Sequence, residues 1–180
     1  MNIRRLVSRF IFYTLKFAIK LFSLFFLRSG MYLFQKLLVK FGMGVNGKIR
    51  YIGFNVVFDD FQLISLGDNI VISDDCHFLT HDYSVTVGLR YMGVKLDTDY
   101  KNFGEIKIGN NVFIGKKSII LPRTEIGDNV IVSAGSVVKG ILKDNSIYQG
   151  NPVECIAKLE DKAKKWKTLY DENKFLADQK

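Results

Sequence analysis

Residues 108–138 read Ile-Gly-Asn-Asn-Val-Phe, Ile-Gly-Lys-Lys-Ser-Ile, Ile-Leu-Pro-Arg-Thr-Glu, Ile-Gly-Asp-Asn-Val-Ile, Val-Ser-Ala-Gly-Ser-Val and Val, so that an aliphatic residue returns at every sixth position. This period differs from the 3.6-residue period of an α-helix and from the simple alternation of a long strand. Six residues suit one short strand and one corner, and Gly, Asn and Asp recur at the corners because they tolerate left-handed backbone angles. The repeat predicts an all-β solenoid in which aliphatic side chains of successive coils stack into one core.

The same rhythm extends towards the N-terminus, through residues 66–78 and, less regularly, through residues 52–56. Over residues 50–158 the sequence resembles the hexapeptide-repeat acyltransferases, and among them the sugar and polysaccharide O-acetyltransferases of the galactoside and maltose acetyltransferase type. The resemblance implies a left-handed parallel β-helix with three hexads in each coil. It also implies a homotrimer with sites at subunit boundaries, and acetyl-CoA as the acyl donor.

The regions outside the repeat divide the chain into three parts. We expect N-terminal amphipathic helices in residues 1–44, the β-helix in residues 45–158, and a C-terminal helix in residues 159–180. The hexad frame stops after Phe78 and resumes in phase at Ile108, which predicts an inserted loop at residues 82–105.

The N-terminal part carries the excess positive charge, because no acidic residue precedes Asp59 in a chain with 26 Lys and Arg against 18 Asp and Glu. Helices are predicted at residues 10–27 and 31–41, and on the first a basic stripe of Arg5, Arg9, Lys16 and Lys20 borders a broad apolar face. This pattern is typical of a helix lying on an anionic membrane surface, and its large aliphatic residues favour lipid over nucleic acid. Packing against the β-helix or a neighbouring subunit, and a true membrane span, remain alternatives.

Two cysteines, Cys76 and Cys155, occupy hexad-like positions, so we expect buried, reduced thiols. Nothing in the sequence favours secretion, and we expect a cytoplasmic protein, peripheral on the cytoplasmic face of the membrane if the first helix binds lipid.

His81 opens the inserted loop and is the candidate general base, because a neutral imidazole can accept the proton of an attacking hydroxyl. In the sugar O-acetyltransferases a histidine lies just before such a loop. The resemblance implies that His81 deprotonates the acceptor while acetyl passes directly from acetyl-CoA. Asp82 either orients or stabilises the imidazole, or caps the loop.

A metal site is not expected. Cys76 and His77 are adjacent and point to opposite faces of a strand, and His77 and His81 are too few for the three zinc ligands of a γ-class carbonic anhydrase.

The segment from Asn111 to Gly115 resembles the family's Asn-Val-Trp-Ile-Gly, with Phe113 in place of tryptophan. The resemblance implies that Phe113 and Gly115 leave room for the pantetheine arm and that the backbone at Ser133 and Ala134 binds the cofactor. Lys139 and Lys158 are the candidate phosphate contacts, and for Lys139 a plain solvated charge is the alternative.

Acceptor binding is assigned to Asn55 by resemblance, and to Asp59 and Asp60 because carboxylates can accept hydrogen bonds from sugar hydroxyls. We therefore expect an acetyl-CoA-dependent O-acetyltransferase for a carbohydrate that is lipid-linked or part of a growing surface polysaccharide, such as O-antigen or capsule. Acetylation of a small soluble acceptor, a free sugar or an antibiotic, and a non-catalytic scaffold are the alternatives.

Overall fold

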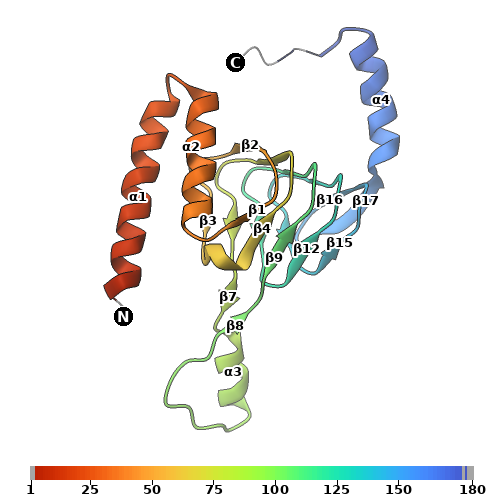
Figure 1. Cartoon of the computed structure of the whole chain (residues 1–180). Helices are drawn as coiled ribbons and strands as arrows, with labels where there is room; N and C mark the ends of the chain where they lie inside the picture. The colour runs from red at the N-terminus through yellow and green to blue at the C-terminus, as the bar shows by residue number, and fades with distance from the viewer. Residues whose placement is uncertain (1–2, 176, 178–180) are drawn as a thin grey trace.

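Three parallel sheets form the sides of a left-handed β-helix (Figure 1). The structure is a computed structural model, which describes residues 3–175 and 177. The first sheet contains β1 (Gly44–Val45), β4 (Ile64–Leu66), β9 (Ile106–Ile108), β12 (Thr124–Ile126) and β15 (Ile141–Leu142). The second contains β2 (Ile49–Ile52), β5 (Ile70–Ile72), β10 (Phe113–Ile114), β13 (Ile131–Val132), β16 (Ser146–Gln149) and the antiparallel β17 (Glu154–Lys158). The third contains β3 (Val57–Phe58), β6 (His77–Phe78), β11 (Ile119–Ile120) and β14 (Val137–Val138).

The six-residue rhythm predicted this core correctly. In the first sheet Ile108 pairs with Ile126, which lies three hexads later, so one coil takes three hexads. Ile114 pairs with Val132 in the second sheet, and Ile120 with Val138 in the third. All of these side chains are buried, because each coil covers the apolar face of the coil before it.

The corner between the first and second sheets is held by a ladder of asparagines. Asn69, Asn111, Asn129 and Asn145 all have φ between 53° and 60°, the left-handed region in which asparagine is tolerated. Their side-chain amides join neighbouring coils by hydrogen bonds of 2.8–2.9 Å. The corner residues therefore set both the turn of the chain and the spacing of the coils.

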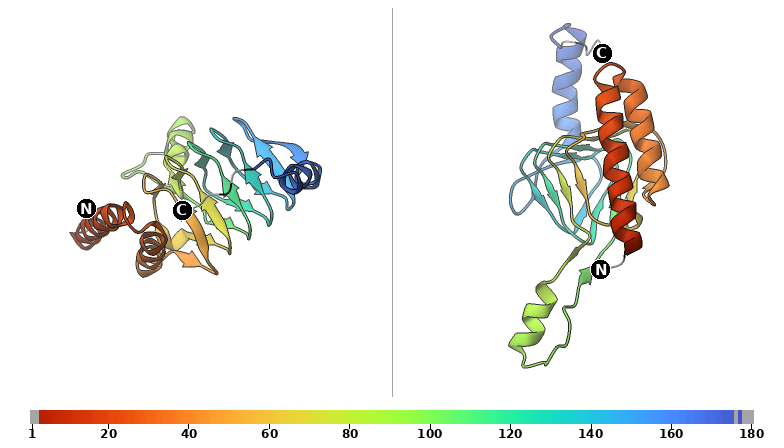
Figure 2. Two further views of the ribbon diagram at one scale, coloured as in Figure 1. Left: turned by 90° about the horizontal axis from the view of Figure 1, so that it is seen from above. Right: turned by 90° about the vertical axis from the view of Figure 1, so that its left-hand side faces the viewer.

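Two helices cover the N-terminal end of the β-helix (Figure 2). They are α1 (Ile3–Ser23) and α2 (Leu27–Lys40). Both begin several residues earlier than the sequence predicted; α1 also ends several residues earlier, and α2 ends one residue earlier. The inward side chains of α2, among them Phe34 and Leu38, are buried against the first coil. A Cβ atom at Gly30 would lie 2.4 Å from Ser23 Cβ, so glycine permits the close approach of the two helices.

The centre of the basic stripe of α1, at Lys16 and Lys20, faces the β-helix, as the packing alternative predicted. Lys16 Nζ donates a hydrogen bond of 3.0 Å to the backbone oxygen of Val56, and Lys20 Nζ donates one of 3.3 Å to Asn55 Oδ1. The reason is that Phe12, on the same side of the helix, is only 3% exposed and draws this face inward.

The outer face of α1 is apolar and exposed. Phe10 and Phe17 are 72% and 63% exposed, and Phe25, in the turn after the helix, is 82% exposed. The side chain of Arg5, also assigned to the basic stripe, lies outside the described part of the structure. Within the described residues, every helix is too short or too polar to cross a lipid bilayer.

The inserted loop projects from the corner between the third and first sheets (Figure 1). Its base is a two-stranded antiparallel ladder of β7 (His81–Asp82) and β8 (Asn102–Phe103), and its tip contains α3 (Ser84–Tyr91). At the other end of the chain α4 (Leu159–Asp171) extends away from the β-helix and buries none of its side chains. A short 3-10 helix, η1 (Phe61–Leu63), precedes β4.

Candidate functional site

The base of the inserted loop is fixed by Thr80, which is fully buried. Its backbone N–H donates to Asp59 Oδ2 at 3.3 Å, and its hydroxyl donates to Asp60 Oδ2 at 2.9 Å. Because these bonds tie the loop to the preceding coil, they also determine where the next residue, His81, projects.

His81 is held by the same carboxylate. Its Nδ1 atom lies 3.0 Å from Asp60 Oδ2 and 3.8 Å from Asp59 Oδ2, and the imidazole is 18% exposed. A carboxylate can only accept, so the ring proton belongs on Nδ1 and the lone pair on Nε2. An imidazole in this tautomer is prepared to take a proton at Nε2.

Lys101 lies at the open side of the imidazole, a contact that sequence reasoning missed. Its Nζ atom is 3.4 Å from His81 Nε2, and it lies 5.3 Å and 5.6 Å from the ring centres of Tyr83 and Phe103. The residue is half-buried. Lys101 is 20 positions from His81 in sequence, and the two meet only because β7 pairs with β8.

Asp82 bonds within the loop. Its Oδ1 atom accepts hydrogen bonds from the backbone N–H of Ser84, at 2.9 Å, and from the Ser84 hydroxyl. These bonds lower the pKa of the Asp82 carboxyl below its usual range. The structure thus gives Asp82 the contacts of a loop-capping residue, while Asp60 makes the contact to the imidazole that sequence reasoning considered for Asp82.

The three acceptor candidates fall in two places. Asp59 and Asp60 lie beside His81, whereas Asn55 lies at the corner between the second and third sheets and accepts its bond from Lys20. Only the two aspartates therefore share the surroundings of the imidazole within one chain.

The cofactor candidates Phe113, Gly115, Ser133 and Ala134 lie along that same corner between the second and third sheets. Phe113 is 41% exposed and Ala134 is exposed. Gly115 is buried, and a Cβ atom there would lie 2.4 Å from the backbone nitrogen of Ala134. Glycine is therefore needed at position 115 so that the next coil, which contains Ser133 and Ala134, can stack on it. The surface at this corner is formed by that next coil.

The two lysine candidates are exposed and far apart along the chain. Lys139 follows β14 and so lies at the corner between the third and first sheets, the corner that also carries His81. Its positive charge contributes to the lowered pKa of Asp82. Lys158 ends β17 and directly precedes α4.

Apart from Lys139 and Lys158, the residues assigned to catalysis and to cofactor binding thus occupy two different edges of the triangular coil. His81, Asp59 and Asp60 lie at one edge, and Gly115 and Ala134 at the other, with the third sheet between them. One chain alone does not bring the two groups together.

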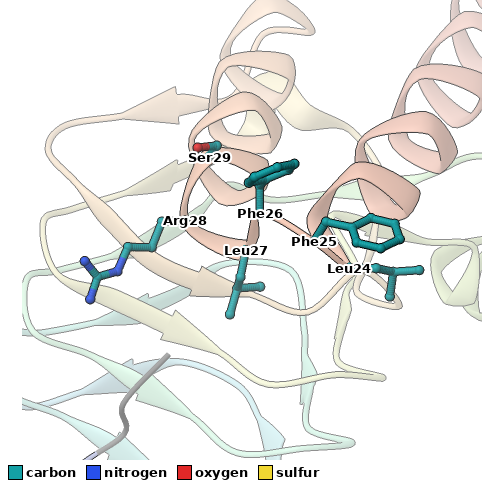
Figure 3. Close-up of a pocket in the computed structure, with 6 residues that line it drawn as sticks. All are labelled: Leu24, Phe25, Phe26, Leu27, Arg28 and Ser29. Atoms are coloured by element: carbon teal, nitrogen blue, oxygen red, sulfur yellow. The ribbon is translucent and has the colours of Figure 1, made fainter.

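A separate hollow of about 510 Å³ lies at the turn between α1 and α2, away from the inserted loop (Figure 3). It is lined by Leu24, Phe25, Phe26, Leu27, Arg28 and Ser29. Its apolar walls continue the exposed face of α1, and it contains no group suited to acid–base chemistry.

The described residues contain no group of three or more His, Cys, Asp or Glu side chains that could hold a metal ion. Cys76 is buried, and burial raises the pKa of its thiol. Cys155 is exposed, so the expectation of a buried thiol is wrong there, because β17 is an edge strand that leaves its side chain in solvent.

Comparison with known proteins gives the following similarities. The model of the family described as bacterial transferase hexapeptide (six repeats) matches residues 105–140. Protein CapG of Staphylococcus aureus is 38% identical over 123 residues, which are 67% of this chain and 69% of that protein. Galactoside O-acetyltransferase of Escherichia coli K12 is 33% identical over 129 residues, 70% of this chain and 61% of the relative.

A protein of Escherichia coli K12 described as a putative lipopolysaccharide biosynthesis O-acetyl transferase is 27% identical over 150 residues, 70% of this chain and 72% of the relative. A solved structure of galactoside acetyltransferase in complex with coenzyme A superposes with a TM-score of 0.62 at 21% identity, covering 87% of this chain and 83% of that one. The chain spans between about half and three fifths of the length of several curated relatives.

Proposed function

This chain belongs to the hexapeptide-repeat transferases, and from that membership we propose that it transfers acetyl from acetyl-CoA to a hydroxyl group of a carbohydrate. The observation that carries the proposal is the pairing of His81 Nδ1 with Asp60 at 3.0 Å, which leaves Nε2 as the proton acceptor. The galactoside O-acetyltransferase among the relatives supports a sugar acceptor.

The chemistry follows from the tautomer of the imidazole. When bound, acetyl-CoA supplies an acetyl thioester. His81 takes the proton of the acceptor hydroxyl at Nε2 as the acceptor oxygen bonds to the acetyl carbon and the carbon–sulfur bond breaks. Asp60 stabilises the positive charge that develops on the ring, and the proton then leaves with the thiol of the released coenzyme A.

The exposed corner at Ala134 suits the extended pantetheine arm of acetyl-CoA, which carries amide groups. Phe113 and Ala134 are exposed, and the position that a Cβ atom would take at Gly135 is open. These residues, with Gly115 and Ser133 beneath them, would hold acetyl-CoA, while Lys139 and Lys158 would meet its phosphates. The acceptor would contact Asp59, Asp60 and, from the opposite edge, Asn55.

The separation of the two edges supports a homotrimer. A neighbouring copy would bring its Ala134 edge to the His81 edge of the first chain, which completes a site that one chain leaves divided. α4 buries none of its own side chains and offers a surface for the same neighbour.

The acceptor in this proposal is lipid-linked or part of a growing surface polysaccharide, made at the cytoplasmic face of the membrane. Two observations support it: the exposed apolar face of α1, and the relative described as a lipopolysaccharide biosynthesis O-acetyl transferase. A peripheral helix would hold the enzyme close to such an acceptor.

The direct test uses the purified full chain, acetyl-CoA and a panel of pyranosides, with release of coenzyme A as the measurement. We expect transfer by the wild type and a loss of at least about 100-fold in kcat for His81→Ala, the range reported for removal of a general base. Acetyl-CoA should raise the Tm of both proteins, because the variant keeps the cofactor edge. Unchanged transfer by His81→Ala would show that His81 is not the general base. A Tm that does not respond to acetyl-CoA would favour the alternative that the protein is a non-catalytic scaffold.

A further inference from the structure

Lys101 occupies the position that the acceptor hydroxyl must reach. Asp60 engages Nδ1 of His81, so Nε2 is the only ring nitrogen left to receive the acceptor proton. The Lys101 ammonium points at that nitrogen from 3.4 Å. A hydroxyl that donates to Nε2 therefore has to displace the ammonium from its hydrogen bond.

The ammonium has few other partners in the free protein. Its remaining contacts are the faces of Tyr83 and Phe103, and none of the ion pairs found among the described residues includes it. Asp59 and Asp60, the carboxylates beside the imidazole, direct their Oδ2 atoms to Thr80 and His81, and neither forms an ion pair with Lys101. Displacement by a neutral sugar would replace the lost bond only with bonds from the half-buried ammonium to hydroxyl or water oxygens, which are weaker than a bond to an anion.

An acidic acceptor removes this difficulty, because its anionic group provides the ammonium with a charge-assisted hydrogen bond while its hydroxyl takes the place at Nε2. We infer that the acceptor sugar is acidic and that Lys101 selects it; this inference rests on the proposed function. The anionic group is a carboxylate or an equivalent, on the same sugar residue as the hydroxyl or on the residue bonded to it. Tyr83 and Phe103 hold the ammonium on that side of the imidazole.

The test compares acceptors that differ only in charge. Methyl galactoside is paired with methyl galacturonide, and methyl glucoside with methyl glucuronide, each with the full chain and acetyl-CoA. The wild type is measured beside Lys101→Gln, which keeps a polar side chain without the charge. Lys95→Gln is the matched control, because Lys95 is an exposed lysine of the same loop.

We expect the wild type to prefer at least one hexuronide over its hexoside by about tenfold or more in kcat/KM, chiefly through a lower KM, as for other desolvated ion pairs. Lys101→Gln should remove that preference by lowering kcat/KM for the hexuronide alone, and Lys95→Gln should leave it intact. A further readout is ionic strength, since added salt should weaken hexuronide transfer more than hexoside transfer.

Transfer to both members of each pair with equal kcat/KM would overturn this inference and leave the proposed function standing. An equal fall for both members in Lys101→Gln would also overturn it, because the lysine would then act on the imidazole and not on the acceptor. A wild type that transfers acetyl to none of the four sugars would count against the proposed function itself, and the inference would fall with it.

Discussion

At the scale of single residues, the site depends on one carboxylate that serves two neighbours. Asp60 Oδ2 accepts from the Thr80 hydroxyl and from His81 Nδ1. The first bond fixes the loop, and the second fixes the tautomer of the imidazole. Asp60 is therefore a positioning residue in the proposed reaction, and its effect should pass through His81.

Substitution of Asp60→Asn should lower kcat by roughly 100-fold, because an amide can present its N–H to Nδ1 and favour the wrong tautomer. The KM for acetyl-CoA should change little, since the cofactor edge is separate. Steady-state kinetics over a range of pH measure this, and Asp97→Asn, an exposed aspartate of the same loop, is the control. A kcat equal to that of the wild type would show that Asp60 does not position the base.

Lys16 supplies a prediction about stability. Burial, with the nearby charge of Lys20 as the second cause, lowers the pKa of Lys16 to about 8 from the usual 10.5. The folded protein then releases this proton at a lower pH than the unfolded chain does. The contribution of Lys16 to the free energy of unfolding should therefore rise as the pH increases from about 8 to 10.5, because the unfolded state binds more protons at this group over that interval.

The size of the effect is limited by partial exposure of the side chain. We expect a gain of about 1–2 kcal/mol between pH 7 and pH 10, less than the full shift would give, because water screens the charge. Urea unfolding at several pH values should show that the free energies of unfolding of the wild type and of the exposed control Lys40→Met rise by this amount relative to that of Lys16→Met. A rise of equal size in Lys16→Met would contradict the assignment.

At the scale of elements, α1 joins the protein through a narrow inner face and presents a broad apolar surface to solvent. Phe12 is buried, while Phe10 and Phe17 are more than 60% exposed. The hollow at the turn between α1 and α2 extends this surface with further apolar side chains. An apolar face of this kind is suited to the boundary between headgroups and acyl chains.

We expect the full chain to sediment with vesicles that contain phosphatidylglycerol, and the double substitution Phe10→Glu and Phe17→Glu to reduce the bound fraction by about tenfold or more, since charged groups replace apolar ones. Tyr170→Glu is the control, because Tyr170 is 71% exposed on α4 at the opposite end of the molecule. Equal sedimentation of the double variant would show that this face binds something other than lipid.

At the scale of the whole molecule, the division of the site between two edges predicts complementation between chains. His81→Ala damages one edge, and Ala134→Trp would block the other without touching the core, since Ala134 is exposed. Each variant alone should be inactive. In mixed trimers assembled at random, about a quarter of the interfaces would pair two intact edges.

Co-expression of the two variants should therefore restore up to about a quarter of the wild-type rate, measured as coenzyme A release per trimer. Mixing the two proteins after purification, without exchange of subunits, is the control and should restore nothing. Failure of co-expressed, co-purified variants to recover any activity would indicate that the site forms within a single chain.

The sequence by itself determined the β-helix, because its causes are local or periodic. An aliphatic residue at each sixth position, with small polar residues at the corners, indicates a β-helix. The break in the repeat after Phe78 marks the inserted loop, with His81 at its start. The existence of the terminal helices could also be predicted, although not their exact bounds, because an amphipathic pattern is visible within a few helical turns.

Only the tertiary structure decided which residues surround the imidazole and which side of α1 faces inward. Asp60 and Lys101 reach His81 through the stacking of coils and the pairing of β7 with β8, contacts between residues about 20 positions apart that no local pattern encodes. Lys16 lies against the β-helix because burial of Phe12 outweighs the cost of partly burying a charge. The local sequence pattern determines the shape of each coil, whereas the stacking of coils and the pairing of distant strands determine which side chains become neighbours.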